Sequence, residues 1–198
     1  MPQRGGPFIE PTRSTAAVPP ALQQMRVAKQ GDNDYACGLF ALVTAARKLG
    51  TTSARAGVTT ILGGLEGTAR ARIEARLPKI GLFEKDLRAL ADAAGLAVYR
   101  PNTHDAAQFR EPGWLWMALV LVRFTSPNGE ETYVQKHYVL VVEHLPTAGA
   151  LVVADPHPWN PPVYCVGEHE FEVAWRAAKT KGPPWAAALY PASGRAQT

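Results

Sequence analysis

Residues 30–49 read QGDNDYACGLFALVTAARKL, a polar turn followed by an apolar helix that begins at Cys37. Apolar side chains then recur at steps of three and four, which indicates one buried helical face. These residues are Leu39, Phe40, Val43, Ala46 and Leu49. Gly50 follows as the left-handed residue that ends such a helix, and the turn offers Asp32, Asn33 and Asp34 as N-terminal caps. We expect the rest of the chain to pack around this helix.

Cys37 stands at the N-terminal end of the predicted helix. The unpaired N–H groups and the positive dipole of that end favour a thiolate. They can also bind a negative charge that develops on a substrate carbonyl. Gln30 precedes the turn and can fold back to supply a second amide donor, whereas a charge on Asp34 would oppose the thiolate. A cysteine before a glycine in an apolar helix is more often a small core residue. Cys37 alone therefore does not indicate catalysis, which also requires a base elsewhere in the chain.

The composition predicts one domain and a short arm. With 198 residues, of which 46% are hydrophobic, the chain can bury one sizeable core, which we assign to residues 21–198. Residues 1–20 contain five prolines and no hydrophobic periodicity. Such a segment is typical of a flexible N-terminal arm that is mobile or wraps around the domain.

The charge and the cysteine count exclude several classes of protein. A net charge of +4 without an Arg/aromatic recognition module indicates a solvated basic surface, so nucleic acid is not the expected partner. Two cysteines, Cys37 and Cys165, are too few for a disulfide scaffold or a Cys-based zinc site. No metal and no cofactor are expected, and Cys165 is interpreted as a packing residue in a strand.

The sequence shows no apolar signal segment and no stretch of the length of a membrane span. We therefore expect the protein to work in the cytoplasm, or to be exported without a cleaved signal peptide, and to have no membrane partner.

The order of the expected elements indicates an α+β fold, with an N-terminal helical part packed on a C-terminal antiparallel sheet. Two further helices are expected, at about 68–77 and in the segment that ends at Gly95. Strands are expected at 96–99, 114–124, 133–144, 150–155 and 186–190, with a helix at 171–179. The segment 51–67 is interpreted as loose and broken by glycines.

His137 and Asp155 are the candidate base and its partner. His137 opens the strand HYVLVVEH, and Asp155 ends the next strand, LVVADP. A turn centred near residues 146 and 147 would place the two residues within two positions of each other across an antiparallel pair. Both numbers are odd, so their side chains should share a face, and a carboxylate there would orient the imidazole. A register shift of one residue would separate them.

The remaining candidates have weaker support. His157 is the reserve base, and His144, of opposite parity to His137, is expected to face away from it. His104 and His169 are interpreted as surface residues. Among the tryptophans, Trp114 and Trp116 fit core packing, while Trp159, in a proline-rich loop, is the better candidate for the wall of a cleft.

Taken together, the motifs resemble the papain-like cysteine peptidases. The resemblance is closest to the double-glycine peptidases, which include the leader-peptide-processing domains of bacterial peptide exporters. The matching segments are Gln30, Cys37-Gly38, the helix before Gly95-Leu96, WLWMALVLV, His137-Tyr138-Val139-Leu140-Val141 and Asp155-Pro156. The chain departs from the family pattern at Ala36, where an acid commonly precedes Cys-Gly, and it carries no transporter segment.

The resemblance implies a papain-like fold and a set of roles. Cys37 would be the nucleophile, His137 the general base and acid, Asp155 the residue that orients His137, and Gln30 part of the oxyanion hole. Gly38, Trp159 and His157 are the candidate substrate-binding residues. The family preference implies a glycine-rich substrate that is cleaved after Gly-Gly. The chain's own Gly63-Gly64 is better interpreted as a flexible loop than as a self-cleavage site.

The expected function is that of a cysteine endopeptidase acting on a protein or peptide substrate. By analogy, it would be a secreted bacterial effector toxin with a cognate inhibitor or immunity protein. The same residues would also serve a deamidase, a transglutaminase or a cell-wall peptide hydrolase. The non-enzymatic alternative is a binding module that keeps the fold while Cys37 is idle.

Overall fold

The computed structural model describes residues 6–11, 16–31, 35–51, 57–78, 81–101, 104–179 and 182–193. The helices are α1 (Pro20–Gln23), α2 (Cys37–Leu49), α3 (Val58–Gly63), α4 (Gly67–Arg76), α5 (Glu84–Ala93) and α6 (Glu168–Ala177), with short 3₁₀ turns at Ala106–Arg110 and Pro146–Ala148. The strands are β1 (Leu96–Tyr99), β2 (Leu115–Thr125), β3 (Thr132–Leu145), β4 (Ala150–Ala154), β5 (Val163–Gly167) and β6 (Ala186–Pro191). They form one antiparallel sheet in the order β1-β6-β2-β3-β4-β5.

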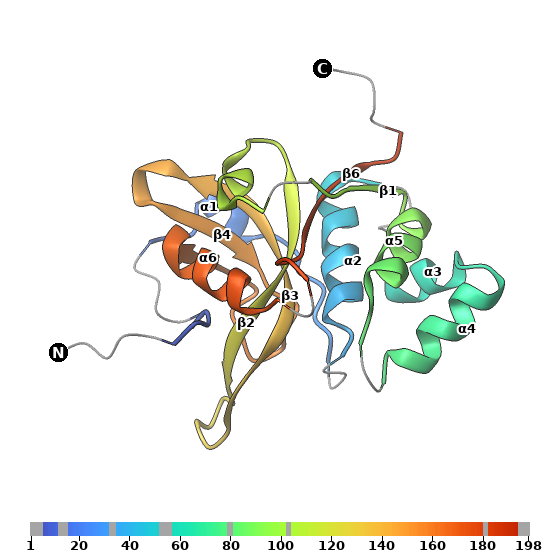
Figure 1. Cartoon of the computed structure of the whole chain (residues 1–198), viewed down its shortest axis with the longest axis horizontal. Coiled ribbons are helices and arrows are strands. Elements are labelled where there is room, and N and C mark those ends of the chain that lie inside the picture. The colour runs from blue at the N-terminus through green and yellow to red at the C-terminus, as the bar shows by residue number, and fades with distance from the viewer. Residues whose placement is uncertain are drawn as a thin grey trace.

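Helices cover both faces of this sheet, as Figure 1 shows, with α2 to α5 on one side and α6 on the other. Successive side chains of a strand point to opposite faces, so each central strand serves two cores. On β3, Leu140 belongs to the cluster around α2, whereas Val139 and Val141 belong to the cluster around α6. This is the predicted α+β layout, with the N-terminal helices packed on a sheet drawn mostly from the second half of the chain.

Helix α2 begins at Cys37, as predicted, and ends at Gly50, whose φ of 68° only glycine adopts readily. The N-cap residue is Ala36, and its side chain makes no capping hydrogen bond. The three residues predicted as caps lie outside the described residues. Gly38 allows α2 to approach its neighbours, because a Cβ there would lie 2.9 Å from Leu87 Cδ2 and 3.2 Å from Tyr138 Cδ2.

A β-bulge decides how β3 pairs with β4. Leu145 pairs with Ala150, and one-to-one pairing from there would place Asp155 opposite an even-numbered residue of β3. The register shifts between Val141 and Glu143, however, so Leu140 pairs with Ala154. Asp155, the next residue, therefore falls on the same face as the odd-numbered residues of this part of β3. His137 and Asp155 lie on the same face of the sheet, as predicted, because of this bulge.

The same bulge reverses the prediction for His144. Beyond the bulge His144 pairs with Leu151, whose side chain faces α6, and its Nε2 lies 2.7 Å from Glu168 Oε1 at the start of α6. His144 therefore lies on the face of the odd-numbered residues that precede the bulge, and not on the opposite face as predicted.

Part of the N-terminal arm lies against the sheet. Ile9 forms a parallel bridge with Val122 of β2 and is buried in the cluster around α6. Its N–H donates to Leu121 O and its carbonyl accepts from Arg123 N, each at 2.9 Å. Residues 6–11 thus wrap around the domain, while residues 1–5 and 12–15 lie outside the described ranges.

Two elements differ from the prediction in the helical half and at the sheet edge. The segment interpreted as loose contains α3, and Gly63-Gly64 closes this helix instead of forming a flexible loop. Strand β5 was not among the predicted strands, although Cys165, which lies in it and is buried, was predicted to be a packing residue. Within the described ranges, no helix is both long and apolar enough to cross a membrane.

Candidate active site

His137 and Asp155 form a buried hydrogen-bonded pair, with His137 Nε2 2.7 Å from Asp155 Oδ1 and no solvent exposure of either residue. The carboxylate accepts three further hydrogen bonds. Oδ1 accepts from His157 N at 2.8 Å, and Oδ2 accepts from Asn160 Nδ2 at 2.8 Å and from Tyr164 Oη at 3.0 Å. Four donors on one buried carboxylate hold it as an anion in a single orientation.

The charges of the pair stabilise each other. Burial acts to raise the pKa of Asp155, but the charge and hydrogen bond of His137, with the bonds from His157 and Asn160, hold it below its usual value. Burial likewise acts to lower the pKa of His137. The charges of Asp155 and Cys37, together with the hydrogen bond to Asp155, outweigh burial and raise this pKa to about 10. An imidazolium is therefore the stable form of His137 at neutral pH.

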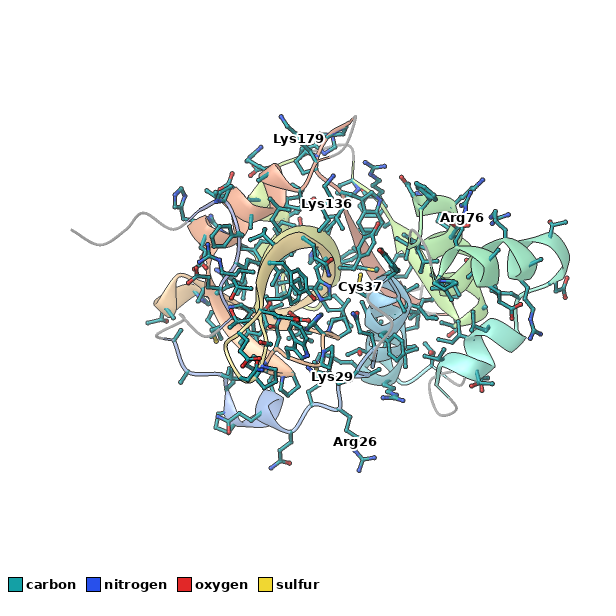
Figure 2. All side chains as sticks on the ribbon, turned by 90° about the horizontal axis from the view of Figure 1, so that it is seen from below. Arg26, Lys29, Cys37, Arg76, Lys136 and Lys179 are labelled. Carbon is teal, nitrogen blue, oxygen red and sulfur yellow. The ribbon has the colours of Figure 1, made fainter. Side chains whose placement is uncertain are left out.

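Cys37 lies at the N-terminal tip of α2 (Figure 2), close enough to this imidazole for its charge to raise the pKa of His137. With Nε2 bonded to Asp155, the other ring nitrogen, Nδ1, is buried and has no oxygen or nitrogen partner among the described residues. Nδ1 is thus the nitrogen open to the thiol. A thiol, an imidazole and a carboxylate thus follow one another, which is the order that thiol catalysis uses.

The Cys37 side chain opens into a cleft of about 720 Å³ between the helical part and the sheet. The helical side contributes Tyr35, Gly81, Leu82, Phe83 and Glu84, with Arg100 from the end of β1. The sheet side contributes Leu119, Gln135, Lys136 and Tyr138, together with Gly182, Pro183 and Trp185 from the segment before β6.

Gln30 is held at the edge of the Asp155 loop, because its N–H donates to Pro156 O at 2.9 Å. Its side-chain amide is buried, and neither Oε1 nor Nε2 has a hydrogen-bond partner among the described residues. An unpaired buried polar group costs about 1–3 kcal/mol.

The structure does not bring Trp159 or His157 to the cleft predicted for them. Trp159 contacts Tyr133, and it lines a separate hollow of about 230 Å³. His157 is buried behind the pair, where its ring lies 4.0 Å from that of Phe124 and its Nδ1 accepts from Trp159 N. Burial and the charge of His137 lower the pKa of His157 to about 4, so it stays neutral. Its contribution is the N–H that it donates to Asp155.

The other predicted residues take structural positions. Gly38 is buried beneath Tyr138, where its role is the close packing of α2. Trp116 is buried in the core beside α6, as predicted, whereas Trp114 is more than a third exposed and packs on Tyr99 and Tyr190.

Several residues of the site carried no signal in the sequence. Asn160 and Tyr164 reach Asp155 only because β5 lies beside β4. Trp185 reaches the cleft because β6 pairs with β2, and its ring stands 5.2 Å from that of Tyr138, edge to face. Burial, with the charges of Cys37 and Glu84, raises the pKa of Tyr138, so its hydroxyl stays neutral. In the described ranges no three His, Cys, Asp or Glu side chains are grouped as metal ligands.

No protein-family model and no curated protein matches the sequence. Solved structures do match the fold. One is the peptidase domain of Streptococcus ComA, a bi-functional ABC transporter involved in a quorum-sensing pathway. The TM-score is 0.53 at 17% sequence identity, and the match covers 84% of this chain and 98% of that domain. The likeness confirms the predicted papain-like α+β fold, which this chain shares with that peptidase domain. The chain thus has the fold of a peptidase domain, with a cysteine that lines its cleft and a buried histidine–aspartate pair that interacts with this cysteine.

Proposed function

We propose that this protein is a cysteine peptidase that cleaves a protein or peptide chain by acyl transfer. The observation that carries the proposal is the buried Asp155–His137 pair, whose free ring nitrogen is open to a cysteine at a helix N-terminus in a cleft. The fold supports it, because a peptidase domain has the same architecture.

In the proposed mechanism the Cys37 thiolate attacks the carbonyl carbon of the scissile bond. The oxyanion that forms is stabilised by the N–H of Cys37 and by the Gln30 amide. His137 gives its Nδ1 proton to the leaving amine, which departs and leaves a thioester on Cys37. The neutral imidazole then takes a proton from water, the hydroxide attacks the thioester, and the thiolate is released. Nε2 keeps its proton throughout and donates it in the hydrogen bond to Asp155, which fixes the orientation of the ring.

The proposed substrate is glycine-rich at the cleavage site, with cleavage after Gly-Gly. The family resemblance suggests this preference. Tyr138 and Trp185, whose rings meet edge to face 5.2 Å apart, line the cleft that contains Cys37 and would contact the residues beside the scissile bond. The role of a secreted effector with a cognate inhibitor stays a prediction from the sequence.

The function is tested by mapping new protein N-termini in a cell extract treated with the wild-type protein or with Cys37→Ala. We expect new termini that follow Gly-Gly, present with the wild type and absent with Cys37→Ala. If no termini appear and intact proteins instead gain about 1 Da at glutamine, the activity is deamidation and the peptidase proposal fails.

A further inference from the structure

Lys29 makes an unusual set of contacts for a half-buried lysine. Its ammonium donates to three backbone carbonyls, those of Asp155 at 3.1 Å, His157 at 2.7 Å and Asn160 at 2.9 Å. An ammonium has three N–H donors, and all three are used. The three carbonyls belong to the loop whose first residue supplies the carboxylate for His137.

The residues on either side of Lys29 bind two different parts of the site. Ala28 N donates to Thr44 Oγ1 at 3.0 Å, and Thr44 lies on α2, the helix that carries Cys37. Gln30 N donates to Pro156 O, in the loop that carries Asp155. The segment 28–30 thus joins the helix of the nucleophile to the loop of the carboxylate.

The position of Lys29 carries an energetic cost. Burial lowers the pKa of Lys29, and the charge of Asp155 offsets this only in part. The Lys29 hydrogen bonds go to main-chain oxygens and not to the carboxylate. Arg26 of the same segment points into solvent in Figure 2 and is exposed. Buried cations persist where hydrogen bonds compensate for lost hydration, and here those bonds define the path of one loop.

We propose that Lys29 is a positioning residue that holds the Asp155 loop in register with α2. Asp155 reaches His137 over 2.7 Å from the loop that Lys29 binds. A displacement of about 1 Å in such an arrangement lowers a rate by ~10²-fold. The inference rests on the proposed function for the identity of Cys37 as the nucleophile.

The test measures the rate at which iodoacetamide alkylates Cys37 at pH 6, followed by mass spectrometry on the Cys37 peptide. It needs no substrate. Lys29→Gln keeps two N–H donors, Lys29→Met keeps the length without donors, and Lys29→Arg keeps the charge but replaces three converging donors with a planar fork. Arg26→Met is the matched control, since it removes an exposed cation three residues away.

We expect rates in the order wild type, Lys29→Gln, Lys29→Met, with Lys29→Met slower than the wild type by ~10-fold or more. Lys29→Arg should fall below the wild type, and Arg26→Met should equal it. Rates are compared per folded molecule, with the folded fraction taken from circular dichroism. The proposal is overturned if every folded Lys29 variant keeps the wild-type rate, or if losses match the unfolded fraction. A wild-type Cys37 no more reactive than a free thiol would instead count against the peptidase function.

Discussion

Two aspartates of this chain, Asp86 and Asp155, have no solvent exposure, and the protein pairs them differently. Asp86, on α5, accepts from Arg72 and Arg76 of α4 at 2.8 Å each, and from Phe83 N at 3.1 Å. These partners hold its pKa below the usual value, against the effect of burial. Arginine stays protonated at every ordinary pH, so this ion pair is a permanent connection between two helices.

Asp155 instead pairs with a histidine, whose proton can leave and return. Its other partners are an amide, a phenol and a main-chain N–H, and these hold the carboxylate without competing for a proton. Partners of fixed charge suit a buried aspartate to a structural role. Under the proposed function, a titratable partner suits the other aspartate to chemistry.

The largest expected effect comes from Asp155→Asn. The amide nearly preserves the shape of the side chain, but it cannot stabilise the imidazolium and it favours the wrong tautomer. The corresponding change in a serine-protease triad lowers kcat by ~10⁴-fold, and we expect a loss of that order in the rate of peptide cleavage. Circular dichroism should show a folded protein. A variant that is folded and fully active would contradict the role given to Asp155.

The matching change on the other aspartate, Asp86→Asn, should act on stability. Breaking a fully buried ion pair costs about 3–5 kcal/mol. We expect the lower value of about 2 kcal/mol, because Arg72 and Arg76 are 31% and 25% exposed and regain water. Urea unfolding measures the loss, and kcat per folded molecule should stay near that of the wild type. A large fall in kcat without loss of stability would erase the distinction between the two aspartates.

The pH dependence of stability should also distinguish the Asp155–His137 pair from the ion pair of Asp86 with its two arginines. The folded-state pKa of His137 is raised to about 10, so its contribution is complete below the unfolded value of ~6.5 and is lost as pH rises toward 10. The folded-state pKa values of Asp86 and Asp155 are lowered, so these residues contribute stability above the unfolded pKa of ~3.9, and this contribution is lost only in acid. The lowered pKa of His157 also affects stability in acid. The change in stability at alkaline pH is therefore the one that separates His137 from the two aspartates.

Urea unfolding between pH 6.5 and 10 measures this alkaline loss, with His137→Gln as the control. We expect the wild type to lose stability across this range and the variant to lose less. Parallel curves for the two proteins would show that the imidazolium does not contribute to folding.

The parts of the site that the sequence predicted are those that local patterns determine. The step of three and four residues after Cys37 predicted α2, because helical periodicity follows from one buried face. The strands of His137 and Asp155 followed from their apolar runs and the turn between them. Their shared face depends on the bulge at Val142, which no local pattern announces.

The contacts that the sequence did not predict arise from chain topology. Lys29 reaches the Asp155 loop across 126 residues, and Trp185 reaches the cleft because β6 inserts beside β2. Trp159 was assigned to the cleft because it lies in a proline-rich loop two residues after His157, but this loop turns it toward Tyr133, and it does not line the cleft of Cys37. Proximity along the chain was a poor guide wherever a loop reversed direction.

The most direct test of the account is the rate of Cys37 alkylation at pH 6 in the wild type and in His137→Ala. In the proposed mechanism the imidazole of His137 activates the Cys37 sulfur, and the rate of alkylation reports that activation. We predict rapid alkylation of the wild type and a large fall in rate, toward that of free cysteine, in His137→Ala. Equal rates in the two proteins, or a wild type as slow as free cysteine, would contradict the pairing of this thiol with His137.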